Sequence, residues 1–286
     1  MPGVGGAIAR YWWTLEGASM DWLRPAAARD IAARDAAGMA CFPLVPFSNR
    51  VRHGRFDFDG REIRLPLNQL PAPHTEHGHG WQAPWTVVAR ADDRLTIEYR
   101  HRADAWPFAY RARQTFRLSP RSLVVDIALT NLARRRMPVG IGLHPYFPRT
   151  PRTVLTARTE RIWLTDREVM PVALADPPPA YRLDRGLRVA RRELDNAYTG
   201  WRRRAEIRWP ERRARLVMSA RGPLSFLVVY SPPGESYFCA EPVSNCTDAF
   251  NLAAAGRRDT GMIVLPPRAR VGARVTFQPM LDHARP

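Results

Sequence analysis

The chain has 286 residues, of which 45% are hydrophobic and 25% charged, and this ordinary globular composition excludes disorder, collagen or a coiled coil for the chain as a whole. The formal net charge of +17 comes from 44 basic residues, all of them arginine. Lysine binds phosphate well, so its absence and the dispersal of the arginines favour solvated arginine on loops and strand faces over a nucleic-acid surface.

The start of the chain and its cysteines bear on its location. The first ten residues lack a charged region followed by a long apolar run, so we expect no signal peptide. The longest apolar stretch, near residues 224–230, is far shorter than the about 20 residues of a spanning helix, which argues against a membrane partner. Cys41, Cys239 and Cys246 fit no CxxC zinc pattern and are interpreted as reduced thiols of a cytoplasmic protein.

Short segments typical of β-strands recur along the chain, most of them bounded by Pro, Gly, Asp or Asn. They are residues 7–13, 61–67, 86–88, 94–99, 112–118, 122–130, 205–209, 214–220, 224–230, 237–240, 261–265 and 273–278. This spacing predicts an all-β fold, an antiparallel sandwich or barrel, in a single domain over 1–286. Helical periodicity is weak. Residues 25–37 are interpreted as a helix or a surface loop, and residues 171–184, with three consecutive prolines, as a long loop.

The first polar segment is CFPLVPFSNR at residues 41–50. It ends in Asn49 and Arg50, an amide beside a planar guanidinium with five donors. That pair suits the binding of several hydroxyl oxygens, and a surface turn is the alternative.

The second segment, residues 74–85, holds His74, His77 and His79 followed by Trp81 and Trp85. A metal site is one interpretation, because His77 and His79 at i and i+2 would share a strand face. Gly78 and Gly80, on either side of His79, favour a loop instead. The next carboxylate after Trp81 is that of Asp92. The alternatives are a solvated polar loop, or a sugar site in which one imidazole hydrogen-bonds the sugar and a Trp stacks on it.

The third segment, residues 137–147, reads as a strand. Alternation places Val139, Ile141 and Leu143 on one face, and two glycines with His144 on the other. The glycines leave room for a close approach, and a histidine over that space is suited to proton transfer. A buried, hydrogen-bonded core histidine is the alternative.

The last two segments each contribute a carboxylate. Asp195 lies in LDNAYTGW, where a turn aspartate is the simpler interpretation. Glu241 follows an apolar strand directly before a proline, and apolar surroundings would raise the pKa of its carboxyl group. Such an unfavourable placement suggests a base or a binding group, with an ordinary strand-end glutamate as the alternative.

Taken together and in this order, the segments resemble the aldose 1-epimerase (galactose mutarotase-like) family, in its compact bacterial form. The resemblance is carried by FPLVPFSNR, an HG followed eight residues later by Trp, GLHPYF, DNAYTGW, and Glu-Pro with a downstream AFN. It spans roughly residues 5–280. It implies a large β-sandwich with an open groove for a sugar, and the interconversion of the α and β anomers of aldoses without a cofactor or metal.

The resemblance also implies roles for particular residues. Glu241 would be the general base at the anomeric hydroxyl, and His144 the general acid at the ring oxygen. His77 would hydrogen-bond the sugar near the ring oxygen, and Asp195 would bind hydroxyls and fix the sugar's orientation. Arg50, with Asn49, would bind further hydroxyls.

Several alternatives stay open at this point. The sugar is either a free aldose or a hexose 6-phosphate, and a non-catalytic sugar-binding protein on the same fold is a second class of function. A metal-dependent enzyme using the three histidines and an arginine-rich nucleic-acid binder are weaker hypotheses. We expect a sugar as the only partner, with no nucleic acid and no membrane, in a monomer or homodimer.

Overall fold

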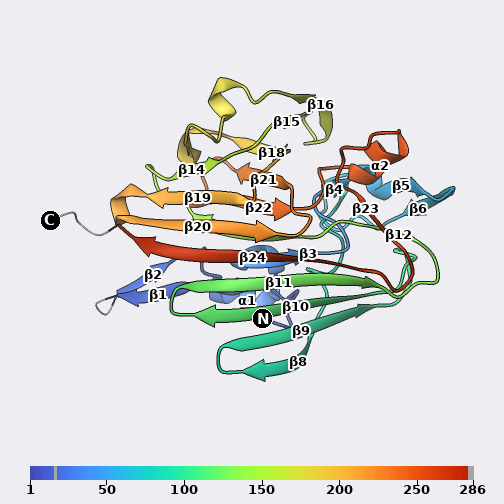
Figure 1. The fold of residues 1–286 in the computed structure, drawn as a ribbon, viewed down its shortest axis with the longest axis horizontal. Helices are drawn as coiled ribbons and strands as arrows, with labels where there is room; N and C mark the ends of the chain where they lie inside the picture. Colours follow the sequence, from blue (N-terminus) through green and yellow to red (C-terminus); the bar gives the residue numbers. More distant parts are fainter. Residues whose placement is uncertain (16–17, 283–286) are drawn as a thin grey trace.

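A computed structural model describes residues 1–15 and 18–282 and shows two large sheets (Figure 1). The larger sheet has nine strands, in the spatial order β17 (Leu187–Arg188), β14 (Val154–Ala157), β19 (Arg204–Trp209), β20 (Ala214–Arg221), β24 (Arg270–Leu281), β11 (Ser122–Asn131), β10 (Tyr110–Ser119), β9 (Arg94–His101) and β8 (Thr86–Ala91). The smaller sheet has seven, in the order β16 (Pro171–Ala175), β15 (Ile162–Thr165), β18 (Leu194–Tyr198), β21 (Phe226–Ser231), β22 (Tyr237–Val243), β13 (Gly142–Pro148) and β3 (Cys41–Leu44). Neighbouring strands in both sheets run antiparallel, so the prediction of an antiparallel all-β fold is confirmed.

Smaller elements surround the two sheets. The two-stranded pairs are β1 (Trp12–Leu15) with β2 (Ala18–Asp21), β4 (Arg50–Val51) with β7 (Thr75–Glu76), β5 (Arg55–Phe58) with β6 (Arg61–Arg64), and β12 (Met137–Val139) with β23 (Ile263–Leu265). The helices are α1 (Ala28–Ala33) and α2 (Ala249–Ala254), with short 3-10 turns at Ala36–Gly38, Arg52–Gly54, Pro179–Tyr181, Val189–Arg191 and Pro210–Arg212. Among the described residues, no helix has the length and hydrophobicity needed to cross a membrane.

Strand β11 illustrates why the sequence forms these sheets. Leu123, Val125 and Ile127 alternate with less buried residues and point into the core, as the period of two requires. Asp126 points to the opposite face, where Arg117 and Arg274 of the two neighbouring strands pair with it. These two arginines lie on a strand face outside the core, one of the places where the sequence predicts arginine, and they pair with a carboxylate across strands.

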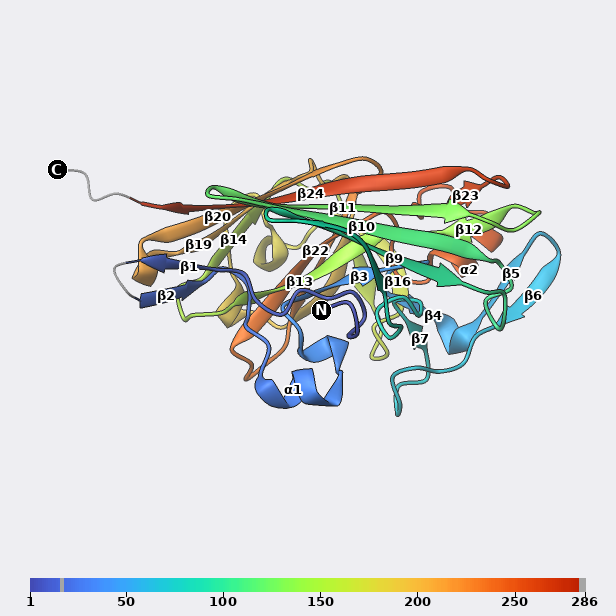
Figure 2. The same cartoon turned by 90° about the horizontal axis from the view of Figure 1, so that it is seen from below.

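The seven-stranded sheet is covered on both faces. Leu143 and Phe238 point into the core shared with the nine-stranded sheet, whereas Tyr146 and Cys239 belong to a second apolar cluster on the opposite face. The second cluster is completed by the N-terminal segment and by Trp81. Figure 2 shows the long strands β24, β11 and β10 on one side of the molecule, and α1 with the β4–β7 segment on the other. Strand residues that alternate outward from the main core therefore still meet protein on the second face.

The segment 137–147 is not the single strand that its alternation predicts. Strand β12 ends at Val139 and β13 begins at Gly142, and the two belong to different sheets. A Cβ on Gly140 would lie 1.8 Å from Oδ1 of Asn245, and one on Gly142 would lie 2.7 Å from a side-chain carbon of Val243. The predicted close approach to these glycines is present, but the approaching group is neighbouring protein.

Two other segments also differ from expectation in part. The segment predicted as a loop at 171–184 begins as strand β16, which pairs with β15 at the edge of the seven-stranded sheet. Residues 25–37, for which the sequence predicts a helix or a surface loop, contain the short helix α1, and the 3-10 turn Ala36–Gly38 follows it.

Candidate active site

A cavity of about 140 Å³ lies on the face of the seven-stranded sheet that points away from the main core. Its walls include all six residues that the sequence singled out, namely Asn49, Arg50, His77, His144, Asp195 and Glu241. A larger hollow of about 840 Å³ lies between the N-terminal segment and the β8–β9 turn, contains none of the six and is mainly apolar. The smaller cavity is therefore the candidate site, because it gathers the titratable groups.

Two of these residues, His144 and Glu241, lie side by side on adjacent strands. Strand β13 carries His144 and β22 carries Glu241, and the flanking pairs Gly142–Val243 and Tyr146–Cys239 set a register that brings them opposite each other. His144 Nε2 lies 3.3 Å from Oε1 of Glu241, and the two side chains are only 7% and 3% exposed. Such a pair, buried and in contact, is suited to passing a proton.

The surroundings of His144 disfavour its charged form. Its ring stacks between Phe42, at a centroid distance of 4.5 Å, and Tyr146, at 4.7 Å, while the ring of His77 meets it edge-on at 5.2 Å. Burial lowers the pKa of His144 well below its ordinary value, and the neighbouring His77 lowers it further. The imidazole therefore holds an extra proton only where a negative charge compensates for it.

Glu241 is shifted in the opposite direction. Burial raises the pKa of its carboxyl group well above 4.5, and the negative charge of Asp195 adds to the effect. Among the described residues, Oε2 of Glu241 and Nδ1 of His144 have no hydrogen-bond partner. Because both groups resist being charged, the pair holds one proton in total over a wide pH range, either on the carboxyl group or on the imidazole.

His77 is held in one tautomer by its neighbour Asn49. The backbone N–H of Asn49 donates to Nδ1 of His77 over 3.0 Å, so the proton of the neutral ring lies on Nε2. The backbone N–H of His77 in turn donates to the carbonyl oxygen of Asn49 over 2.9 Å. Burial lowers the pKa of His77 to about 4, so at neutral pH it is an uncharged hydrogen-bond donor at the cavity wall.

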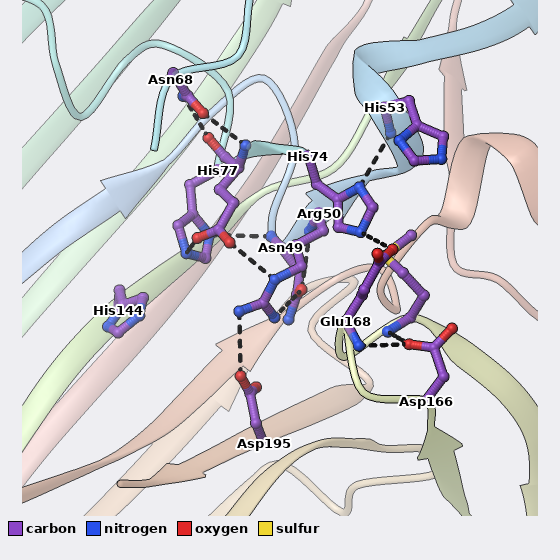
Figure 3. A network of polar contacts seen from close by, with 12 residues as sticks. Asn49, Arg50, His53, Asn68, His74, His77, His144, Asp166, Glu168 and Asp195 are labelled. Atoms are coloured by element: carbon purple, nitrogen blue, oxygen red, sulfur yellow. Dashed lines mark hydrogen bonds and ion pairs between the residues drawn. The ribbon is translucent and has the colours of Figure 1, made fainter. Parts of the chain in front are cut away.

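Arg50 links two carboxylates across the site, as Figure 3 shows for its contact with Asp195. Its Nη2 lies 3.2 Å from Oδ2 of Asp195, and its Nε lies 2.8 Å from Oε1 of Glu76. Burial raises the pKa of Asp195, and the charge of Arg50 opposes that rise. The side-chain oxygen of Asn49 accepts from the backbone N–H of Arg50 over 2.8 Å, which fixes the start of β4.

Glu76 is a cavity residue that the sequence reasoning missed. It lies on β7, directly across from Arg50 in the register of β4 and β7, and it lines the cavity. The two strands have only two residues each, so no periodic pattern could place them together. The one feature of the sequence that could have indicated Glu76 as a site residue is its position directly before His77.

The three histidines of the 74–85 segment do not form a metal site with one another. His79 contacts the hydroxyl group of Tyr110 through Nε2 at 2.8 Å and stacks near His101, away from the cavity. His74 lies between the backbone N–H of His53, at 3.1 Å from Nδ1, and Oε2 of Glu168, at 3.2 Å from Nε2 (Figure 3). The structure therefore brings only His77 to the site, and the metal interpretation of this segment is wrong. Positive φ angles at His77 and Gly78 turn the chain there, which separates neighbouring side chains.

Comparison with known proteins gives one consistent result. A family model described as aldose 1-epimerase matches residues 1–278. The uncharacterized protein YphB of Escherichia coli (strain K12) is 32% identical over 260 residues, covering 88% of this chain and 86% of that protein. The crystal structure of an Escherichia coli K12 protein provisionally assigned as an aldose 1-epimerase superposes with a TM-score of 0.87 at 28% identity, over 98% of this chain and 94% of that one. A galactose mutarotase-like protein from Clostridium acetobutylicum, at 19% identity, shares the fold with a TM-score of 0.86 over 98% of this chain and 91% of that one.

Proposed function

The chain belongs to the aldose 1-epimerase family, and from that premise we propose that it interconverts the α and β anomers of a free aldose. The observation that carries the proposal is the buried contact of 3.3 Å between His144 and Glu241 at the wall of a small polar cavity. Opening a cyclic hemiacetal requires removal of one proton and addition of another on two oxygens of the same carbon. A carboxylate and an imidazolium that share one proton supply both groups.

In the proposed reaction, the carboxylate of Glu241 takes the proton of the anomeric hydroxyl group while the imidazolium of His144 gives a proton to the ring oxygen. The bond between the anomeric carbon and the ring oxygen breaks, and an open-chain aldehyde forms. Rotation about the C1–C2 bond turns the other aldehyde face toward the former ring oxygen. The ring then closes as Glu241 returns its proton to the carbonyl oxygen and neutral His144 takes the hydroxyl proton.

Burial of the pair supports this cycle. The total number of protons on Glu241 and His144 is the same before and after ring opening, so the site needs no proton exchange with water. The uncharged arrangement that burial favours is also the one that the pair has when the ring is open. The low dielectric around the pair therefore lowers the free energy of the open-chain stage relative to the ion-paired one.

The other cavity residues are proposed to hold the sugar. The Nε2–H of His77 is a fixed donor for an oxygen next to the reacting centre, a placement that its contact with Asn49 supports. Asp195 and Arg50 offer an acceptor and donors to neighbouring hydroxyl groups. Fixing the sugar in this way keeps the two reacting oxygens within reach of the acid and the base, and such orientation lowers the barrier.

Polarimetry of freshly dissolved α-D-glucose and α-D-galactose tests the proposal. Wild type is expected to accelerate the change in rotation, and Glu241→Gln is expected to reduce that acceleration by about 10²–10⁴-fold, the usual contribution of a general base. Calorimetry would show whether Glu241→Gln still binds the sugar. A variant that binds the sugar and interconverts anomers at the wild-type rate would overturn the assignment. Binding by wild type without any acceleration would support a sugar-binding protein instead.

A further inference from the structure

The wall of the candidate site carries a charge opposite in sign to that of the whole chain. The chain has 44 arginines and a formal charge of +17, yet among the described residues that line the cavity Arg50 is the only arginine. The same wall carries three carboxylates, from Glu76, Asp195 and Glu241. The long-range field of the protein and the local field of the site therefore favour different ligands.

The single cation of the wall is already neutralised by its neighbours. Arg50 contacts Glu76 at 2.8 Å and Asp195 at 3.2 Å, so it faces two carboxylates at once. His77 is uncharged at neutral pH, because burial lowers its pKa to about 4. The pair of Glu241 and His144 holds one proton and adds no net charge. The wall as a whole is therefore negative.

The polar side-chain atoms of the wall that remain free for a ligand are mostly hydrogen-bond acceptors. Arg50 occupies Oε1 of Glu76 and Oδ2 of Asp195, which leaves the second oxygen of each carboxylate for a ligand. Oε2 of Glu76 lies 3.7 Å from Nε2 of His77, too far for a hydrogen bond. Carboxylate acceptors bind hydroxyl and ammonium groups, whereas phosphate and carboxylate groups offer them no proton at neutral pH.

Glu76 is fixed in this position by its backbone. Its N–H donates to Oδ1 of Asn68 over 2.8 Å, and its carbonyl oxygen accepts from Nδ2 of Asn68 over 2.8 Å. The pairing of β7 with β4 sets Glu76 directly across from Arg50. Because Asn68 holds the backbone of Glu76 and Arg50 contacts its carboxylate, that carboxylate does not move away easily when an anionic group approaches.

We propose that Glu76 determines the substrate class of this site, so that the site rejects aldoses bearing a phosphate or a carboxylate and accepts neutral aldoses and aldoses bearing a protonated amino group. This inference rests on the proposed epimerase function for the reaction itself. The rejection of anions and the acceptance of cations do not depend on the reaction. They rest on the contacts of Arg50, Glu76 and Asp195 in a wall whose other titratable groups add no net charge.

The test compares four aldoses that share the glucopyranose ring, namely D-glucose, D-glucosamine, D-glucose 6-phosphate and D-glucuronate. Glucuronate differs from glucose by little more than its charge, so it separates the effect of charge from the added bulk of the phosphate. Their KM values would be measured by polarimetry and their Kd values by calorimetry, near 0.15 M salt, where the Debye length of about 8 Å screens the general positive charge of the surface. Wild type is expected to favour glucosamine and glucose over both anionic sugars. In Glu76→Gln the ratio of affinities for glucosamine and glucose 6-phosphate is expected to fall by about tenfold, the effect of one nearby charge.

Glu62→Gln is the matched control, because it makes the same change in charge on the exposed β5–β6 hairpin, where Glu62 pairs with Arg64. It is expected to leave the ratio unchanged. Glucose 6-phosphate that binds wild type as well as glucose does would overturn the proposal. So would a Glu76→Gln variant that loses all four sugars to the same degree, since a purely structural role has that result. If wild type accelerates none of the sugars but calorimetry keeps the expected order, the epimerase function fails and the charge selection stands.

Discussion

Two buried glutamates, one in each sheet, show how differently the same side chain behaves in this molecule. Glu98 on β9 is 8% exposed, and Arg113 and Arg100 each contact it at 2.8 Å. Burial raises the pKa of Glu98, but the hydrogen bonds from these arginines outweigh it and leave the pKa below its ordinary value. Glu241 on β22 has His144 as its ion-pair partner, and its pKa rises well above the ordinary value.

The difference shows that burial alone does not mark a reactive group. Glu98 is covered by arginine side chains that themselves reach solvent, and their positive charges compensate its negative charge. Its carboxyl group is therefore ionised at neutral pH. Glu241 has apolar and aromatic neighbours and one unpartnered oxygen, so its proton can still move. A buried carboxylate whose partner is a titratable histidine and not an arginine is therefore the better sign of acid–base chemistry.

The pH dependence of mutarotation would sharpen this comparison most. The Glu241–His144 pair gains a second proton only below the ordinary histidine value of 6.5, and loses its single proton only well above the ordinary glutamate value of 4.5. The turnover rate, corrected for the uncatalysed reaction, is therefore expected to be flat around neutral pH. Outside the plateau it should fall by about tenfold per pH unit on each side, as the base is protonated in acid and the acid is lost in alkali.

Glu98→Gln provides the control, because it removes a buried carboxylate that has no part in the proposed reaction. Its pH profile is expected to match that of wild type. A wild-type rate that rises through an ordinary glutamate pKa and shows no alkaline limb would contradict the shared proton.

The effect on stability should be smaller and opposite for the two glutamates. The lowered pKa of Glu98 contributes stability above its unfolded pKa that is lost as the pH falls through the folded value. The raised pKa of Glu241 instead makes its ionisation unfavourable to folding at neutral pH. Glu98→Gln is therefore expected to lower the free energy of unfolding by about 1 kcal/mol, and Glu241→Gln to leave it unchanged or raise it.

Urea denaturation of both variants at pH 7 would measure the difference. A large loss of stability in Glu241→Gln, together with none in Glu98→Gln, would reverse the roles that we assign to the two residues.

His144, Glu241 and the general fold could be singled out from the sequence because each has a local signal, whereas the roles of the two residues came from the family resemblance. Glu241 stands out as a carboxylate between an apolar strand and a proline, and His144 follows alternating apolar residues. Part of the strands in the two sheets, among them β10, β11 and β20, could be predicted from alternation and bounding turns. Strands β3, β14, β15 and β18 were not predicted, and β16 lies in a segment that was predicted as a loop. The roles of both residues in catalysis stay predictions until activity is measured.

The contacts across the site could not be predicted in the same way. Glu76 and Arg50 meet through two strands of two residues each, which leave no periodicity to detect. The separation of His74, His77 and His79 depends on the left-handed turn at His77 and Gly78, which a spacing of two residues does not reveal. The sequence could not show which group fills the space beside Gly140 and Gly142. The residues that fill it, Asn245 and Val243, lie about 100 residues later in the chain.

The most direct test of the central claim, that Glu241 and His144 pass one proton between them and the sugar, is a double-mutant comparison of mutarotation rates. Polarimetry would be run on wild type, Glu241→Gln, His144→Ala and the double variant under identical conditions. Two residues that act as a unit have strongly non-additive effects, so the double variant is expected to be no slower than the slower single variant. Losses that multiply in the double variant would show that the two residues act independently and would contradict the shared proton.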